Sequence, residues 1–509
     1  MMTMRRLCWL WIALLLLGTV AHAWDFDEEV YICGTLGMSM AELQSAGITL
    51  VSHISHTREW MAEAARYGIR GMPYVSLYKV YDASAPGADR QHPFWSAVEI
   101  TGHPEWVYIG ANGQKARPFN NEFYPKVNWQ SCTNTAGLAE AYARGVAGVI
   151  RNGAGGVFID NVLPAKVCHG PQFGVHQHLY PDKDNIHSFK IALGQVQETL
   201  KGFGPNTVMM LNVGDWTPWQ EFGDCMMLES FIYNIDVRPG PGGWVGNEII
   251  RVKTWPKILA TLKATADHVA GKGNIVTLEY LPEDPEAAFY TYACAKLGDY
   301  HWSPGGRVWR DVARALYRCR LQTAKGPLLE SQGIYFRHYA GGMVAVNSTG
   351  AAVSARLPAP PDCASLADVW DRQVLPVRDG HLDARLPADA GRIYIEPTRL
   401  AVGLLREASV SLRTAQEKSV TPNRPPDPGF ERACAAAELA LRASPDAMAT
   451  AVATLLRALD AGLQGPSQGA GTRLATGPQI APKEALDLLK AEHLPSALRL
   501  TVESDRVVL

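Results

Sequence analysis

The chain has 509 residues, of which 47% are hydrophobic and 19% charged, and its formal net charge is −2 at pH 7. This length exceeds that of one compact domain, so we expect at least two domains with ordinary apolar cores. The near-zero charge gives no general attraction to nucleic acid or to anionic membranes, and we expect no nucleic-acid partner.

The first 23 residues have the pattern of a secretory signal. Arg5 and Arg6 precede an apolar run at 7–20, and Ala21-His22-Ala23 is a small-residue cleavage site. The run is shorter than the roughly 20 residues that span a bilayer. We therefore expect a secreted or periplasmic protein with no membrane span after signal removal.

Residues 24–325 alternate between strand-like and helix-like stretches. The apolar runs that predict strands are 30–33, 48–52, 71–77, 156–159, 207–212, 225–228, 275–278 and, more weakly, 300–302. Helical spacing of apolar residues falls at 57–67, 135–152, 186–202, 248–270 and 285–297. This α/β alternation predicts a (β/α)8 TIM barrel, with a doubly wound sheet as the alternative.

The pattern changes after residue 325. Short alternating runs at 326–397, separated by turn residues, predict a small antiparallel β-sandwich. Residues 398–509 are rich in Ala, Leu and Arg, and we expect a helical, partly flexible C-terminal extension.

Three acidic residues stand at the carboxyl ends of predicted strands. Asp160 ends the run Val157-Phe158-Ile159, Glu229 follows 225–228, and Glu279 follows 275–278. In a parallel barrel these strand ends form the mouth of the active site. The pattern indicates acid/base or nucleophilic chemistry, although each acid could instead cap a helix or pair with an arginine.

Two motifs carry a resemblance to a known group of enzymes. The phrase His103-Pro104-Glu105-Trp106 is followed by a helix and then by the strand 155–161, which bears Asp160. Together they resemble the TIM-barrel glycoside hydrolases, especially polygalactosaminidase-like enzymes and α-glycosidases with an aspartate on the fourth strand. The resemblance implies Asp160 as nucleophile on strand four and Glu229 as general acid on strand six. Glu279 is the reserve acid. Phe158 departs from the pattern, because several of these families have a lysine there.

The resemblance implies a carbohydrate substrate and no cofactor, and the oligomeric state stays open. We expect a retaining enzyme, while inversion through a water molecule is the alternative. Polar and aromatic residues near strand ends, or in the long segment after the third strand, are the expected sugar ligands: Asn161, His53, Tyr74, Trp129, Asn212, Trp216, Tyr280 and His301.

A second group of residues allows other functions. Cys168, His169, His176 and His178 lie close together in sequence, and such residues could bind zinc as in a metal-dependent polysaccharide deacetylase. Cys132 and Cys168 could alternatively form a disulfide between two loops. A carbohydrate-binding protein without catalysis is the other alternative. We predict no metal at the active site.

Overall fold

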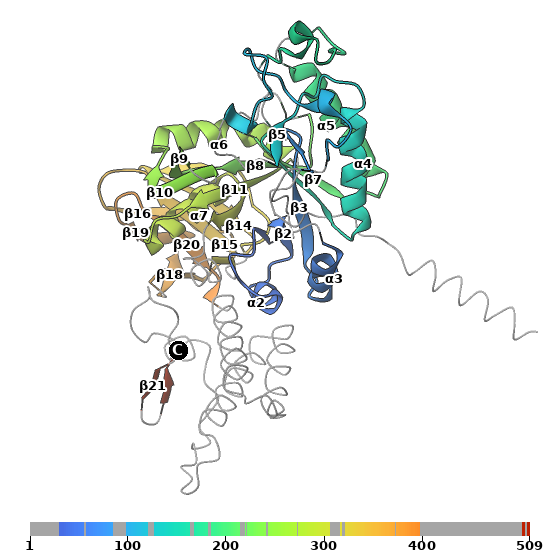
Figure 1. Ribbon diagram of the computed structural model, residues 1–509. Coiled ribbons are helices and arrows are strands. Elements are labelled where there is room, and N and C mark those ends of the chain that lie inside the picture. Colours follow the sequence, from blue (N-terminus) through green and yellow to red (C-terminus); the bar gives the residue numbers. More distant parts are fainter. Residues whose placement is uncertain are drawn as a thin grey trace, which may run out of the picture.

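The computed structural model describes residues 30–397 with short gaps, and a two-stranded hairpin of β21 (Thr501–Glu503) and β22 (Arg506–Val508) (Figure 1). The gaps are 55–56, 85–97, 121–126, 163–166, 182–184, 214–218, 220, 241–242, 272, 306–315, 318–320 and 372. The expected signal at 1–23 lies outside the described residues. Of the helical extension expected at 398–509, the structure describes only this hairpin, which is strand and not helix. None of the helices in the described part of the chain has the length and apolar character needed to cross a membrane.

Eight parallel strands form a TIM barrel, as the sequence predicts. In spatial order they are β1 (Tyr31–Cys33), β2 (Leu50–Ile54), β3 (Arg70–Ser76), β6 (Gly156–Asp160), β7 (Val208–Asn212), β8 (Cys225–Glu229), β11 (Asn274–Tyr280) and β12 (His301–Gly305). The first and eighth strands meet where the Cys33 amide donates a 2.9 Å hydrogen bond to Ser303 Oγ. The order confirms that Asp160 ends the fourth strand and Glu229 the sixth.

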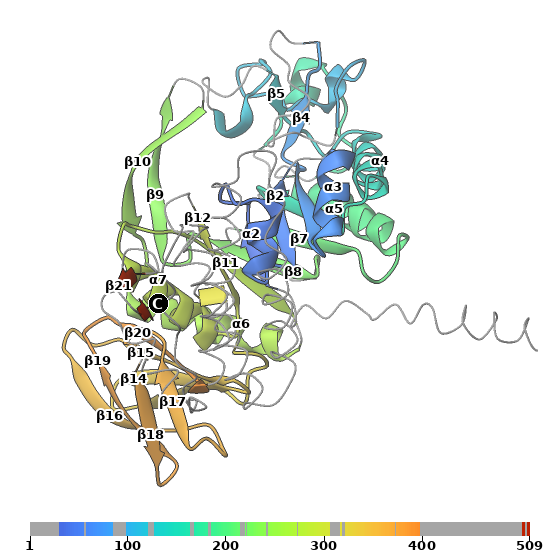
Figure 2. The same cartoon turned by 90° about the horizontal axis from the view of Figure 1, so that it is seen from below.

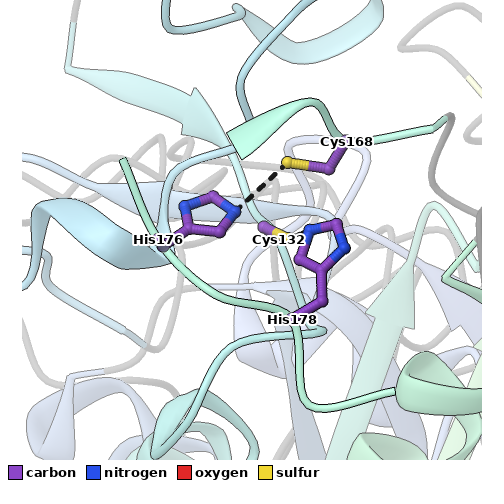
Figure 3. A group of neighbouring side chains, drawn as sticks. All are labelled: Cys132, Cys168, His176 and His178. Carbon is purple, nitrogen blue, oxygen red and sulfur yellow. Dashed lines mark hydrogen bonds between the residues drawn. The ribbon is translucent and has the colours of Figure 1, made fainter. Parts of the chain in front are cut away.

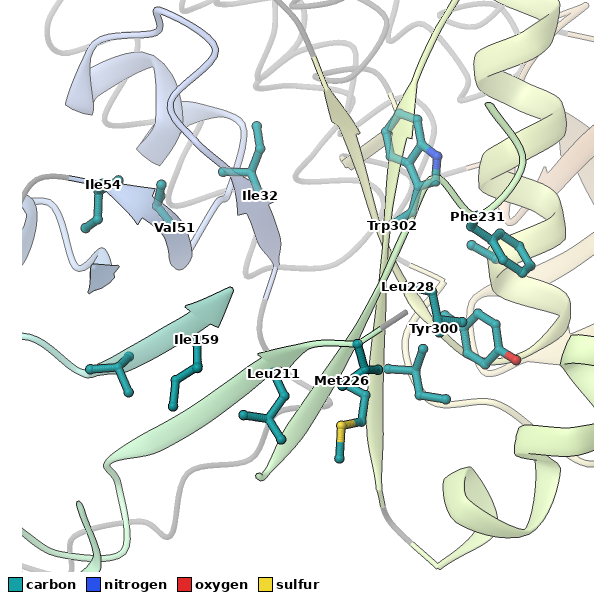
Figure 4. Packing of buried hydrophobic residues seen from close by; sticks show 14 of the residues in the cluster. Ile32, Val51, Ile54, Ile159, Leu211, Met226, Leu228, Phe231, Tyr300 and Trp302 are labelled. Atoms are coloured by element: carbon teal, nitrogen blue, oxygen red, sulfur yellow. The ribbon is translucent and has the colours of Figure 1, made fainter. Parts of the chain in front are cut away.

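The strands are buried on both faces, which explains their continuous apolar runs. Side chains on one face, including Phe158, Met210 and Met227, fill the barrel interior. Those on the other face, including Ile159 and Met226, pack with the surrounding helices (Figure 4). Because side chains alternate along a strand, neighbouring residues occupy different cores.

Helices α2 (Met40–Ser45), α3 (Arg58–Arg66), α4 (Leu138–Arg151), α5 (Ile186–Lys201), α6 (Trp255–Ala270) and α7 (Pro285–Leu297) follow barrel strands. The helix expected at 248–270 begins only at Trp255. The preceding residues belong to an antiparallel hairpin, β9 (Tyr233–Gly240) and β10 (Gly243–Arg251), which projects beyond the barrel (Figure 2). Pro256 at the start of α6 suits the first helical turn, where its missing N–H has no partner to lose.

The long segment after the third barrel strand contains two short antiparallel strands, β4 (Lys79–Tyr81) and β5 (Asn128–Gln130). The hydroxyl of Tyr142 on α4 donates to the carbonyls of Leu77 and Lys79, at 2.9 and 2.7 Å. These bonds fix the point where the segment leaves the barrel. The described parts of the segment next to β4 are thus anchored close to the strand ends.

A second, antiparallel sheet lies beyond the barrel. Its strands, in spatial order, are β13 (Leu329–Ser331), β14 (Ile334–Tyr339), β15 (Gly342–Asn347), β20 (Gly391–Ile395), β17 (Ser365–Asp368), β18 (Val374–Arg378), β19 (His381–Leu386) and β16 (Val353–Pro358). This sheet encloses its own apolar core. Helix α7 packs between it and the barrel, and ten of its residues are buried, so it is apolar on all sides (Figure 2).

Candidate active site

Four adjacent barrel strands each end in a polar side chain. Asp160 ends β6, Asn212 ends β7, Glu229 ends β8 and Tyr280 ends β11. Each stands two residues after a side chain of the interior core, namely Phe158, Met210, Met227 and Leu278. Because side chains repeat their direction every two residues, all four point into the barrel mouth. They form one polar layer on top of the apolar interior.

The amide of Asn212 joins the two acids. Its Nδ2 atom donates to Asp160 Oδ1 at 2.8 Å and to Glu229 Oε2 at 2.5 Å. Since one nitrogen contacts both oxygens, these oxygens are no more than 5.3 Å apart, the sum of 2.8 and 2.5 Å. Two carboxyl groups from distant parts of the chain therefore face the same small volume.

Asp160 has two further hydrogen-bond donors. The Tyr74 hydroxyl lies 2.7 Å from Asp160 Oδ2, and Asn161 Nδ2 lies 2.5 Å from the same oxygen. Lys79 Nζ in turn donates to the Tyr74 hydroxyl at 2.7 Å. The two carboxyl oxygens of Asp160 thus accept hydrogen bonds from Tyr74, Asn161 and Asn212 through their lone pairs.

Lys79 was not predicted from the sequence as part of the site. It starts β4, is 2% exposed, and its ammonium group reaches the Tyr74 hydroxyl. Burial lowers the pKa of Lys79 to about 8, although the charge of Asp160 acts to raise it. The sequence does not indicate that Lys79 belongs to the site, because only the fold shows which way its side chain points.

Glu229 has a different environment from Asp160. Its side chain is partly open to solvent, while neighbouring protein atoms surround the carboxyl group. Desolvation raises the pKa of Glu229, and the charge of Asp160 raises it further. Hydrogen bonds from Tyr280, 2.7 Å from Oε1, and from Asn212 act in the opposite direction. A raised pKa suits a group that must donate a proton near neutral pH.

His53 adds an aromatic wall to the site. Its ring centre lies 5.1 Å from that of Tyr74 and 5.9 Å from that of Phe158. Burial lowers the pKa of His53, while the charge of Asp160 acts to raise it. His53, Asn161 and Ser230 all have left-handed φ angles, of 58°, 56° and 56°. Such angles are uncommon outside glycine and concentrate where structure is held for function.

The structure corrects the role expected for Glu279. This residue lies one position before Tyr280, so its side chain points out of the barrel, toward the core between strands and helices. It is fully buried, and its Oε2 accepts the amides of Ile232 and Tyr233, each at 2.9 Å. Burial raises the pKa of Glu279 to about 8. Glu279 is therefore a buried structural acid that substrate does not reach.

Of the expected sugar ligands, His301 lies away from this cluster, Trp129 contacts a cation of its own segment, and Trp216 is not described. His301 begins β12 and pairs with Val276, whereas Glu279 pairs with Pro304, so His301 lies toward the amino end of the barrel. Trp129 lies on β5, and the Arg117 guanidinium covers one face of its ring at 3.4 Å from the ring centre. Trp216 lies outside the described residues. The other five candidates, Asn161, His53, Tyr74, Asn212 and Tyr280, surround the two acids.

The fold and the site define a TIM-barrel protein with an acid pair at the carboxyl ends of its strands. Residues 74–343 match the family described as hypothetical glycosyl hydrolase family 15, GHL15. This match covers more than half of the chain, and the chain belongs to that family.

Several solved glycoside hydrolases are distantly similar. The glycoside hydrolase domain of PelA from Pseudomonas aeruginosa is 14% identical, with 55% of this chain and 95% of that chain covered and a TM-score of 0.34. A debranching enzyme from Nostoc punctiforme is 13% identical, with 71% and 89% covered and a TM-score of 0.42. An Anoxybacillus α-amylase is 10% identical, with 73% and 98% covered and a TM-score of 0.43. No curated protein sequence matches the chain. These similarities are too distant to transfer a substrate or a residue role.

Proposed function

We propose that this protein is an exported glycoside hydrolase that cleaves O-glycosidic bonds in an oligo- or polysaccharide, with retention of anomeric configuration. The observation that carries the proposal is the Asn212 amide shared between Asp160 and Glu229. Asp160 is the nucleophile and Glu229 is the general acid and base. Export by the leader at 1–23 would leave a mature chain that begins at Trp24.

The environments of the two acids support this division of roles. Glycosidases need one protonated carboxyl group and one ionised carboxylate on either side of the scissile bond. The raised pKa of Glu229 favours its protonated form, whereas Asp160 accepts bonds from Tyr74, Asn161 and Asn212. Glu229 would protonate the leaving oxygen while Asp160 attacks the anomeric carbon. Glu229 would then take a proton from the water that releases the sugar.

The short separation of the acids supports retention. Retaining enzymes hold their carboxyl groups about 5–5.5 Å apart, and inverting enzymes hold them about 6.5–9.5 Å apart to admit a water molecule. The two oxygens that share Asn212 lie no more than 5.3 Å apart, and this close approach supports the shorter arrangement.

The test is a screen of the full chain against a panel of oligo- and polysaccharides, with new reducing ends as the readout. Asp160→Asn should abolish release, and Glu229→Gln should reduce kcat by about 10²–10⁴-fold. Glu221→Gln is the matched control, because that exposed acid pairs with Lys190 on α5 at the surface. Proton NMR of the first product should show the anomer of the substrate. Full activity of Asp160→Asn would refute its role, and an inverted first product would refute retention alone. Sugar binding without any product would favour a carbohydrate-binding protein.

A further inference from the structure

Two cysteine and two histidine side chains meet on the loops that follow β5 and β6. They are Cys132, Cys168, His176 and His178, and their sulfur and nitrogen atoms all lie within 4.8 Å of one another (Figure 3). Cys132 comes two residues after β5. Cys168 and the two histidines lie on either side of the short helix η4 (Gly170–Phe173). His169, which the sequence places beside Cys168, does not belong to the group.

The distances suit a tetrahedral ion. Cys168 Sγ lies 3.4 Å from His176 Nε2, and Cys132 Sγ lies 3.6 Å from His178 Nε2. Zinc bonds of about 2.3 Å to sulfur and 2.0–2.1 Å to nitrogen put two tetrahedral ligands roughly 3.6 Å apart. Both histidines present the same ring atom, Nε2, to a thiol. The other distances between ligand atoms, which are at most 4.8 Å, need to shorten only modestly for all four to bind one ion.

The surroundings hold the four groups in place. Three of them are buried, and Cys168 Sγ accepts the amide of Ile109 at 3.4 Å. Gly170 allows the His176 ring to approach, because a Cβ atom there would lie 2.1 Å from Nε2. Asn134 binds the Tyr180 amide and carbonyl at 2.8 and 3.0 Å, just beyond His178. The ligands are thus preorganised by contacts between the two loops.

We propose that Cys132, Cys168, His176 and His178 bind one structural zinc ion. Two sulfur and two nitrogen ligands are a common set for zinc, and four protein ligands leave no open position for a reacting water. Binding would release the two thiol protons and form two zinc–thiolate bonds. The site is therefore distinct from the catalytic zinc of a deacetylase, which needs an open position.

The competing chemistry is a disulfide between Cys132 and Cys168. Both cysteines are in the reduced form in the structure, and each faces a histidine nitrogen. A disulfide would leave the convergence of two Nε2 atoms on the sulfurs without a role. The zinc ion would instead use all four groups and would join the loop after Asp160 to the segment that contains β5.

The experiment measures metal in the full chain after removal of any affinity tag. Mass spectrometry of the metal should find about one zinc per chain, and Co²⁺ exchange should produce a thiolate-to-cobalt charge-transfer band. Cys132→Ser and His178→Ala should each lose most of the zinc. His169→Ala and Cys363→Ser should retain it, because the His169 ring contacts Gln172 and Cys363 packs against the core of the second sheet.

A measurement on the unaltered protein covers the case in which the variants fail to fold. Alkylation followed by peptide mapping should find Cys132 and Cys168 protected before chelation and reactive after it. Protein without zinc that takes up no Co²⁺, or a Cys132–Cys168 disulfide in the peptide map, would overturn the proposal. Neither result would affect the proposed glycosidase activity, which depends on Asp160 and Glu229.

Discussion

Replacement of Tyr280 by phenylalanine should move the alkaline limb of the pH–rate profile upward. The Tyr280 hydroxyl donates a 2.7 Å hydrogen bond to Glu229 Oε1 and thereby lowers the pKa of Glu229. Without this bond the pKa of Glu229 rises further above its ordinary value. The general acid then stays protonated, and active, to a higher pH.

The size of the shift follows from the strength of the lost bond. A hydrogen bond to a charged group contributes about 1.5–3 kcal/mol, and one pKa unit corresponds to about 1.36 kcal/mol. This gives roughly one to two pH units. Because Glu229 is partly open to solvent, screening brings the expected shift toward one unit.

The assay is kcat/KM as a function of pH on a substrate from the glycan screen. Tyr290→Phe is the matched control, because its hydroxyl accepts a 2.9 Å bond from Arg251 and lies on α7, outside the barrel. The control should leave the limb in place. An alkaline limb that stays fixed or moves down in Tyr280→Phe would show that Glu229 is not the titrating acid.

Two further predictions concern the other polar groups. Asn212→Ala should lower kcat/KM by about 10–100-fold, because it removes one hydrogen bond from each acid. Wild-type kinetics in this variant would show that the bridge has no catalytic role. The pKa of Glu279 is about 8 in the folded protein and 4.5 ordinarily, so between these pH values the folded state holds a proton that the unfolded state has lost. The free energy of unfolding should therefore fall as pH rises from about 4.5 to 8. Glu279→Gln should remove that decline, so that the melting temperatures at pH 5 and pH 8 differ less than in wild type. An equal decline in both proteins would contradict the claim that Glu279 is buried and protonated in the folded state.

Much of the barrel could be predicted from the sequence because its strands are continuous apolar runs. The same patterns placed Asp160 and Glu229 at strand ends, and the strand order confirms positions four and six. The eighth strand was harder, since Pro304 and Gly305 read as turn residues. The strand continues through both, so His301 begins it rather than ends it.

Other features of the site could not be predicted from local patterns. A strand that is buried on both faces has no alternation of polar and apolar residues, so its sequence does not show which side chains point into the barrel. Glu279 and Tyr280 therefore look equivalent in the sequence. Only the register shows that Tyr280 reaches the mouth. Cys132 is separated from Cys168 by α4 and β6, so its approach to the two histidines depends on tertiary structure.

Two methionines lie in the apolar layer beneath the polar groups of the site. Met210 and Met227 lie two residues below Asn212 and Glu229, fully buried in the barrel interior. Methionine is unbranched and polarizable, and it adapts to irregular space more readily than leucine or isoleucine. Substitutions of Met210 and Met227 should therefore change the spacing of the side chains above them. Engineering of this site could begin with these two residues and leave every residue that faces the sugar unchanged.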